Sequence, residues 1–184
     1  MRKVIFFNMM TLDGFFEGTN KELDWHHVDG EFNEFANEQL MSAGVLLFGR
    51  ITYELMVSYW STETAITDDP IIAEQMNAMP KIVFSGTLEK AEWNDTRVVK
   101  EDPAGEILKL KQQPGKNIFI LGSANLVSTL RKANLVDEYR IMINPVLLGQ
   151  GNPLFKSENG KLNLKLIKTR VFNSGNVLLC YEPK

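Results

Sequence analysis

The chain has 184 residues, of which 44% are hydrophobic and 23% are charged, and its formal net charge at pH 7 is -3. We therefore expect one soluble globular domain, residues 1–184, rather than a disordered or fibrous protein. The basic residues are scattered and no run approaches the roughly 20 apolar residues of a membrane span, so neither nucleic acid nor a membrane is an expected partner.

Residues 2–9 are predicted to form a buried strand, because Asn8 interrupts the apolar run too early for a signal peptide. The turn at 11–18 leaves the carboxyl end of this strand, where open α/β sheets bind ligands. Asp13 is therefore a candidate for orienting a substrate, and an Asx-type turn satisfied by its own backbone is an equal alternative. Trp25, in the polar loop that follows, suits either a lid over a pocket or a contact with the core.

The two histidines of the chain, His26 and His27, are adjacent, so their side chains point in different directions on any regular element. Because no Cys or His partner stands at ligand spacing, we expect no metal site. The same scarcity, together with the lack of a G-x-S-x-G motif, disfavours a Ser-His-Asp hydrolase.

A helix is predicted over 31–43, followed by an apolar strand at 44–48 and a second helix that opens after Gly49. The N–H groups at the start of a helix have no internal partners, so this turn favours an anion. Arg50 adds a cation and Thr52 a hydroxyl donor, which suits a phosphate. The alternatives are an ion pair for Arg50 and a capping role for Thr52.

The next segment, 62–70, is predicted to be a linker with turn chemistry, and Pro70 opens a helix. Buried strands are then expected at 81–86 and at 96–100. An amphipathic helix follows with Asp102 as its N-cap.

Small residues, some of them hydroxylated, end the strand at 81–86 and a later strand that leads to Gly122. Ser85 and Thr87 suit a phosphate or ribose contact, and they equally suit an ordinary turn. Further on, an apolar strand ends at Gly122, which allows a sharp turn into a helix capped by Ser123 or Asn125. This second strand, turn and helix presents another anion site of the kind expected at Gly49.

A strand ending at Pro145 is predicted after this helix. Asp137 and Glu138 near its start suit an acid pair for catalysis, although caps or ion pairs away from the ligand fit better at such a junction. The glycine-rich segment 147–155 follows the strand and is expected to wall the same cleft.

The tail, 164–182, reads as a β-hairpin, so antiparallel strands finish an otherwise α/β sheet. The single cysteine, Cys180, lies in an apolar run and is expected to be buried. Because it allows no intramolecular disulfide, the cytoplasm is the expected compartment.

Four segments in order resemble the dihydrofolate reductase-like family, most closely the stand-alone relatives of the reductase domain of bifunctional riboflavin biosynthesis proteins (the RibD C-terminal domain). They are TLDGFFEG with LDW, LLFGRITYE with YW, KIVFSGTLE, and IFILGSANLVSTLRKANLVDEYRIMINPVLLGQGNPLF. The resemblance covers nearly the whole chain. It implies a three-layer α/β/α fold around a mixed, mostly parallel sheet, and a nicotinamide cofactor, usually NADPH with NADH as the alternative.

By this resemblance Gly49, Arg50 and Thr52 hold the adenosine half of the cofactor and its phosphates. Ser85 and Thr87 lie beside the adenosine ribose. The pyrophosphate is held by Gly122, Ser123, Ala124, Asn125 and Leu126. Gly86 stands where the family often has a basic residue, which leaves the choice between NADPH and NADH undecided.

Dihydrofolate reductases carry an acid near the position of Asn33, so a true folate reductase is not expected and the catalytic proton donor is unassigned. On the substrate side, Asp13 is joined by Asn33 and by large apolar residues for which a place in the core is the alternative. These apolar candidates are Met9, Phe16, Trp25 and Trp60. The zinc deaminase of the bifunctional proteins is absent, since no H-x-E with P-C-x-x-C occurs.

The resemblance implies an NAD(P)H-dependent reductase that passes a hydride to a small pteridine-, pyrimidine- or flavin-precursor-like heterocycle, or to a carbonyl-like substrate. A homodimer formed through the C-terminal strands is expected. The rival hypothesis is a non-catalytic nucleotide-binding or regulatory protein on the same scaffold, and a hydrolase comes third.

Overall fold

The computed structural model describes residues 1–155 and 160–184, in which one large sheet has the strand order β5-β4-β3-β6-β1-β7-β10-β9. Its strands are β1 (Val4–Thr11), β3 (Ala43–Gly49), β4 (Lys81–Phe84), β5 (Thr96–Val99), β6 (Asn117–Leu121), β7 (Glu138–Asn144), β9 (Leu164–Val171) and β10 (Val177–Pro183). Neighbours from β5 to β7 are parallel, whereas β10 is antiparallel to both β7 and β9. The predicted mixed, mostly parallel sheet with a C-terminal hairpin is confirmed.

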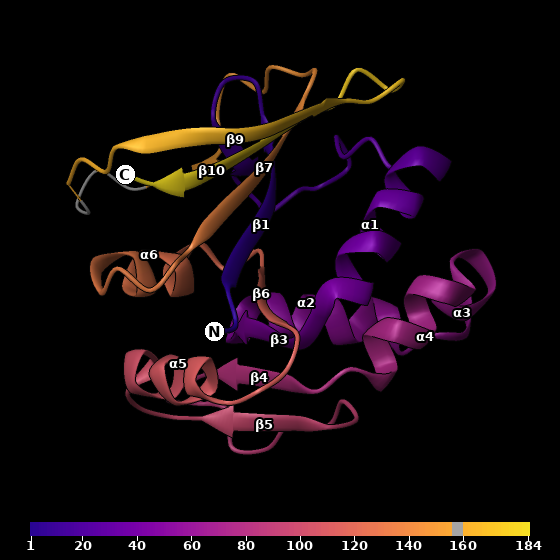
Figure 1. Cartoon of the computed structure of the whole chain (residues 1–184). Coiled ribbons are helices and arrows are strands. Elements are labelled where there is room, and N and C mark those ends of the chain that lie inside the picture. The colour runs from indigo at the N-terminus through magenta and orange to yellow at the C-terminus, as the bar shows by residue number, and fades with distance from the viewer. Residues whose placement is uncertain (156–159) are drawn as a thin grey trace.

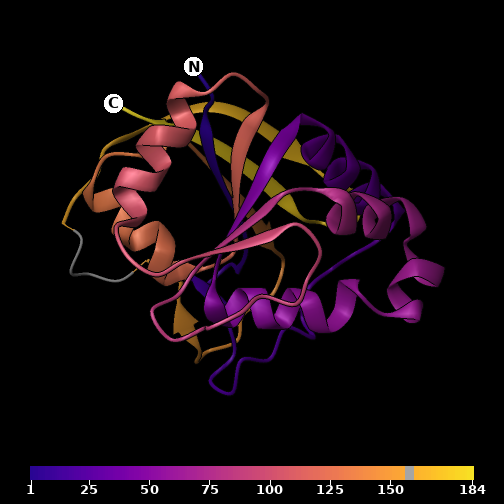
Figure 2. The same cartoon turned by 90° about the horizontal axis from the view of Figure 1, so that it is seen from below.

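Helices cover both faces of this sheet, as Figure 1 shows. They are α1 (Gly30–Ser42), α2 (Arg50–Trp60), α3 (Glu63–Asp68), α4 (Pro70–Ala78), α5 (Pro103–Gln112) and α6 (Ala124–Lys132). In Figure 2 the sheet separates α5 and α6 from the purple helices of the amino-terminal half. The three-layer α/β/α architecture is therefore confirmed.

Side chains along β1 alternate between the two faces of the sheet, so this strand packs against helices of both outer layers. Val4 and Phe6 pack in the cluster that includes residues of α5 and α6, whereas Ile5 packs with residues of α1, α2 and α4. Met9 joins a third cluster with Trp25. Because helices cover both faces of the sheet, most residues of this strand are apolar.

The prediction of a linker at 62–70 is wrong, because Glu63–Asp68 form α3. Thr62 caps this helix by accepting a hydrogen bond from the Ala65 N–H at 3.2 Å, and Ala65 is fully buried. Thr and Asp are common in turns and at helix caps alike, so composition does not separate the two.

A second, two-stranded sheet was not expected from the sequence. It joins β2 (Phe15–Glu17) to β8 (Asn152–Pro153) in antiparallel pairing. It brings the turn after β1 against the glycine-rich segment that follows β7. Of the helices formed by residues 1–155 and 160–184, none has the length and apolar character that a bilayer crossing needs.

Candidate functional site

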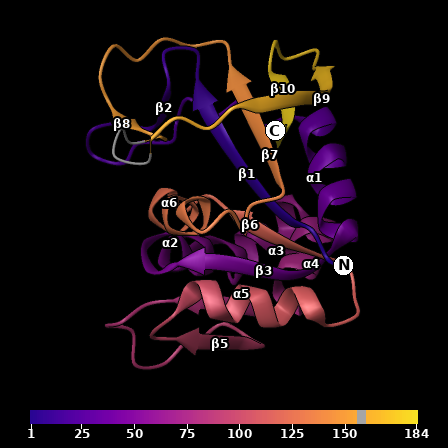
Figure 3. The same ribbon diagram turned by 60° about the vertical axis from the view of Figure 1, so that its left-hand side comes forward.

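A cavity of about 640 Å³ lies at the carboxyl ends of β3, β4, β5 and β6. In Figure 3 this is the side to which the arrowheads of β3 and β5 point. Eight of the predicted cofactor residues line it: Gly49, Arg50, Thr52, Ser85, Ser123, Ala124, Asn125 and Leu126. The predicted residues Thr87 and Gly122 stand next to this lining without being part of it.

Ser123 joins the two helices that begin in the cavity. Its Oγ accepts a hydrogen bond from the Gly49 N–H at 2.7 Å and donates one to Thr52 Oγ1 at 2.9 Å. Gly49 and Ser123 are the N-cap residues of α2 and α6, and neither has a side-chain cap hydrogen bond to its own helix. Two helix N-termini without such caps therefore meet in one cavity, which is a strong arrangement for an anion.

Two glycines lie where these helices approach each other. Gly122 has φ +59, and a Cβ there would lie 3.2 Å from Thr52 Cγ2. A Cβ on Gly49 would lie 3.3 Å from Ser123 Oγ. Side chains at these two positions would push the helix ends apart.

Three basic side chains line the cavity. Arg50 forms an exposed ion pair with Glu54 at 2.8 Å, and Lys100 forms one with Glu89 at 3.1 Å. The third is Lys21 of the loop after β2. Exposed pairs of this kind contribute little to stability, so an incoming phosphate can replace the carboxylate.

Sequence reasoning missed Lys100. It follows Val99, which pairs with Phe84 in β4, so Lys100 comes beside Ser85. Only the strand register places them together, and no local pattern would have found it. Beside them, Gly86 has no atom within 4 Å of the position that a Cβ would take, so space is available there.

Ser85 also has a structural role. Its Oγ accepts hydrogen bonds from the Thr87 N–H at 3.2 Å and from the Leu88 N–H at 2.9 Å. These contacts are those of the ordinary turn that was the alternative for this segment. The hydroxyls of Ser85 and Thr87 lie 3.4 Å apart and are exposed.

Asp13 ties two loops together. Its carboxylate accepts hydrogen bonds from Thr11 Oγ1 at 2.6 Å and from the Gly149 N–H at 2.8 Å. The hydrogen bond from Thr11, followed by those from the Gly149 and Leu148 N–H groups, holds the pKa of Asp13 below its ordinary value. The carboxylate thus anchors the glycine-rich segment, a role that neither alternative for this residue had included.

The other substrate-side candidates are dispersed. Phe16 lines the cavity. Met9 and Trp25, 5% and 7% exposed, lie in the third core cluster, and Trp60 packs against the cluster formed with α2. Asn33 donates to Asp69 Oδ1 at 2.6 Å, which links α1 to the start of α4.

The predicted wall of the cleft comes from β8. Asn152 and Pro153 line the cavity, and Asn152 Nδ2 donates to Glu17 Oε1 at 2.8 Å. Asp137 and Glu138 lie elsewhere, at the amino end of β7, where they pair with Lys111 and Arg140. These contacts agree with the alternative of ion pairs away from the ligand, rather than with a catalytic acid pair. In the part of the chain that the structure describes, no three His, Cys, Asp or Glu side chains gather as a metal site would require.

A protein-family model and a sequence relative both match nearly the whole chain. The family model of the RibD C-terminal domain matches residues 2–178. The uncharacterized protein YyaP of Bacillus subtilis (strain 168) is 36% identical over 187 residues, with 98% of this chain and 95% of YyaP covered.

Two solved structures are also similar. A protein of Shewanella sp. PV-4 named for riboflavin biosynthesis superposes with a TM-score of 0.76 at 25% identity, and 99% of each chain is covered. The dihydrofolate reductase of Enterococcus faecalis, solved with NADP(H), gives a TM-score of 0.66 at 12% identity, covering 99% of this chain and 96% of that one. The last comparison shows that the fold is dihydrofolate reductase-like.

Proposed function

We propose that this chain, which belongs to the RibD C-terminal domain family, is a reductase that binds NADPH along the cavity and reduces a small heterocyclic or carbonyl-like substrate. The observation that carries the proposal is the hydrogen-bonded unit of Ser123, Thr52 and Gly49, which holds two helix N-termini toward one site. A dinucleotide's pyrophosphate is the anion that such a site suits. We propose residues 1–184 as a single domain.

The lining residues suggest how a dinucleotide would lie in the cavity. The pyrophosphate would lie on the N-terminus of α6 beside Arg50, and the adenosine would lie toward Ser85, Val99 and Pro103. The reactive end would then lie toward Phe16 and the β8 wall. The cofactor supplies the hydride, and the protein's part is to bind, orient and exclude water.

Lys100 favours NADPH over NADH in this proposal. Gly86 lacks the side chain that would bind the 2'-phosphate, but Lys100 brings a cation beside Ser85 from the neighbouring strand. The open space at Gly86 leaves room for the phosphate. A charge-assisted contact of this kind discriminates between the two cofactors.

We infer a pteridine-, pyrimidine- or flavin-precursor-like substrate, because Phe16 and Pro153 offer apolar surface at the proposed reactive end. We also infer a homodimer through the exposed edge strand β9, where Leu166, Ile167 and Val171 are 49%, 40% and 71% exposed. Cys180 is buried and free, which agrees with the inferred cytoplasmic location.

Titration with NADPH and NADH, followed by addition of pterin and flavin compounds, tests the proposal. Binding together with loss of NADPH absorbance supports a reductase. Binding without oxidation by any of these compounds favours the non-catalytic nucleotide-binding alternative, and binding of neither cofactor refutes the reductase.

A further inference from the structure

Arg2 is a buried cation without a counter-ion. Its side chain precedes β1 and the residue is only 9% exposed. Nε donates to the Lys116 carbonyl at 2.6 Å. Within residues 1–155 and 160–184, the two terminal amino groups have no hydrogen bond, and the guanidinium has no ion pair. Burial lowers the pKa of Arg2, yet a guanidinium stays charged at any ordinary pH.

Two glycines make the slot in which this guanidinium lies. A Cβ on Gly44 would stand 3.2 Å from Nη2 of Arg2, and a Cβ on Gly115 would stand 3.6 Å from Nε. Gly115 also has φ +140, which side chains rarely adopt. The backbone of two segments therefore closes around the planar group and fixes its orientation.

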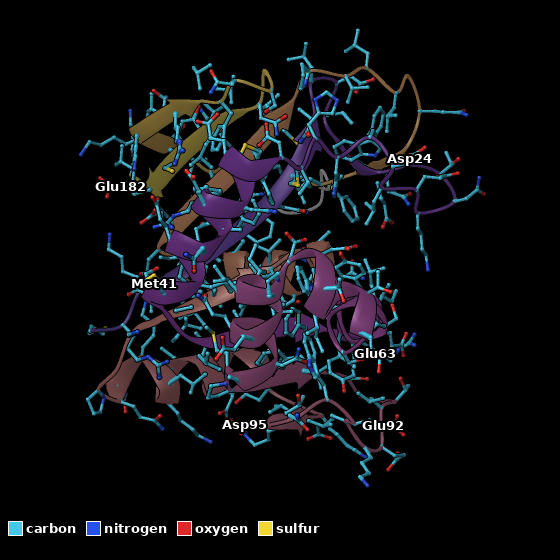
Figure 4. The ribbon with its side chains drawn as sticks, turned by 90° about the vertical axis from the view of Figure 1, so that its right-hand side faces the viewer. Asp24, Met41, Glu63, Glu92, Asp95 and Glu182 are labelled. Atoms are coloured by element: carbon cyan, nitrogen blue, oxygen red, sulfur yellow. The ribbon has the colours of Figure 1, made fainter. Side chains whose placement is uncertain are left out.

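The guanidinium faces a second cavity of about 650 Å³. This cavity lies at the amino ends of β3, β4 and β5, opposite the proposed cofactor cleft. In Figure 3 the N-terminus stands at that end, away from the arrowheads of β3 and β5. Figure 4 labels Asp95, at the edge of the molecule where the chain enters β5, far from Asp24 of the loop before α1.

Two other cationic side chains line this second cavity, and both have partners. Lys81 Nζ donates to the carbonyls of Asn77, Met79 and Asn94 at 2.7–3.2 Å. Arg97 pairs with Glu106. The charge of Asp95 acts on Lys81, whose pKa burial nevertheless lowers to about 8. Among the described residues of the lining, Arg2 is thus the buried cation whose terminal amino groups bond to no protein group.

We propose that this second cavity binds a small organic or inorganic oxyanion, a carboxylate or a phosphate, in a bidentate contact with the terminal amino groups of Arg2. The terminal amino groups of Arg2 are not among the fully buried polar atoms of the described residues, so a ligand can reach them, and a planar fork of N–H donors matches two oxygens of such a group. Val45, Ile82 and Trp93 line the same cavity, so the ligand's body is apolar or absent. The site is separate from the cofactor cleft and does not depend on the proposed function.

The test uses the full chain, with inorganic phosphate and succinate as probes at constant ionic strength. The readouts are the thermal midpoint and the NMR shift of the Trp93 indole N–H, which reports on the cavity wall. We expect a saturable response to at least one probe, and the stronger probe identifies phosphate or carboxylate as the ligand chemistry. Arg2→Met should lower that affinity at least tenfold, and Arg2→Lys, which keeps the charge but loses the fork, should give an intermediate value.

Two variants separate this site from others. Arg50→Gln should abolish only a response that arises in the cofactor cleft, and Lys3→Met controls for loss of an exposed neighbouring cation, since the Lys3 side chain is 55% exposed. Without oxyanion, Arg2→Met should be at least as stable as wild type, and this order should reverse at saturating probe. The proposal is overturned if no response remains in Arg50→Gln, or if Arg2→Met and Arg2→Lys both bind as wild type does. If Arg2→Met does not fold, the oxyanion affinity of Arg2→Lys and the Trp93 indole shift of the wild type test the proposal instead.

Discussion

Ser123 Oγ donates a hydrogen bond to Thr52 Oγ1 at 2.9 Å, across 71 residues of sequence, and thereby joins the first turn of α2 to the start of α6. The same oxygen accepts from the Gly49 N–H, and its single O–H donor is used in the bond to Thr52. Ser123 therefore serves the proposed cofactor site by holding two helix ends in place. The proposed phosphate contacts are left to backbone N–H groups, to Arg50 and to the O–H of Thr52.

Ser123→Ala removes this link and leaves the Gly49 N–H without its acceptor. We expect the free energy of unfolding to fall by about 1–2 kcal/mol, and NADPH affinity to fall about tenfold because the helix ends are no longer held together. Urea denaturation and calorimetric titration measure the two effects. Ser58→Ala is the matched control, because Ser58 donates its hydrogen bond within its own helix, to the Leu55 carbonyl. Unchanged NADPH affinity in Ser123→Ala would show that the link does not shape the site.

Gly122→Ala tests the close approach at the same turn. The new Cβ meets Thr52, and the backbone has a positive φ, so we expect a loss of stability of about 1–3 kcal/mol. Gly86→Ala is the comparison, because its Cβ would have no neighbour within 4 Å and its φ is not positive. Equal midpoints of denaturation for the two variants would contradict this account of the turn.

Lys100→Gln tests cofactor choice. We expect NADPH to bind about tenfold more weakly and NADH to bind as before, because only NADPH carries the 2'-phosphate. Glu89→Gln frees Lys100 from its ion pair and should strengthen NADPH binding slightly. Arg50→Gln, by contrast, should weaken both cofactors. If Lys100→Gln weakened both equally, the lysine would not discriminate between them.

His26 should make stability depend on pH. Burial lowers the pKa of His26 from 6.5 to about 4, and Nε2 is buried without a hydrogen-bond partner in the described part of the chain. The unfolded chain therefore binds a proton at a higher pH than the folded chain does. The stability contributed by neutral His26 is complete above about pH 6.5 and is lost as the pH falls through 4.

His26→Gln should accordingly flatten the dependence of unfolding free energy on pH between 4 and 6.5, by an amount on the order of 3 kcal/mol across that window. The matched control is His27→Gln, since that neighbouring side chain is exposed. Denaturation at several pH values measures the slopes. Parallel curves for wild type and His26→Gln would refute the assignment.

Short-range patterns in the sequence predicted most of the strands and helices and the two turns, after β3 and β6, that line the cavity. Gly49 and Gly122 each stand between an apolar strand and a helical repeat, and this punctuation is visible without any tertiary information. The prediction of a linker at 62–70 was wrong because the same residue types make turns and cap helices. The burial of Ala65 distinguishes the helix from a linker.

The rest depended on contacts between distant segments. Lys100 reaches the site through the register of β4 with β5, and Asp13 anchors a loop 136 residues away. Large apolar residues such as Met9 and Trp25 have the composition of a pocket wall and of a core alike, and burial places them in the core. No local pattern carries that information.

Titration of the wild-type protein with NADPH tests the central claim most directly. We expect saturable binding of one NADPH per chain, weakened by Ser123→Ala and by Arg50→Gln. Absence of any heat or thermal shift with NADPH and with NADH, in a protein whose fold is verified by circular dichroism, would contradict it.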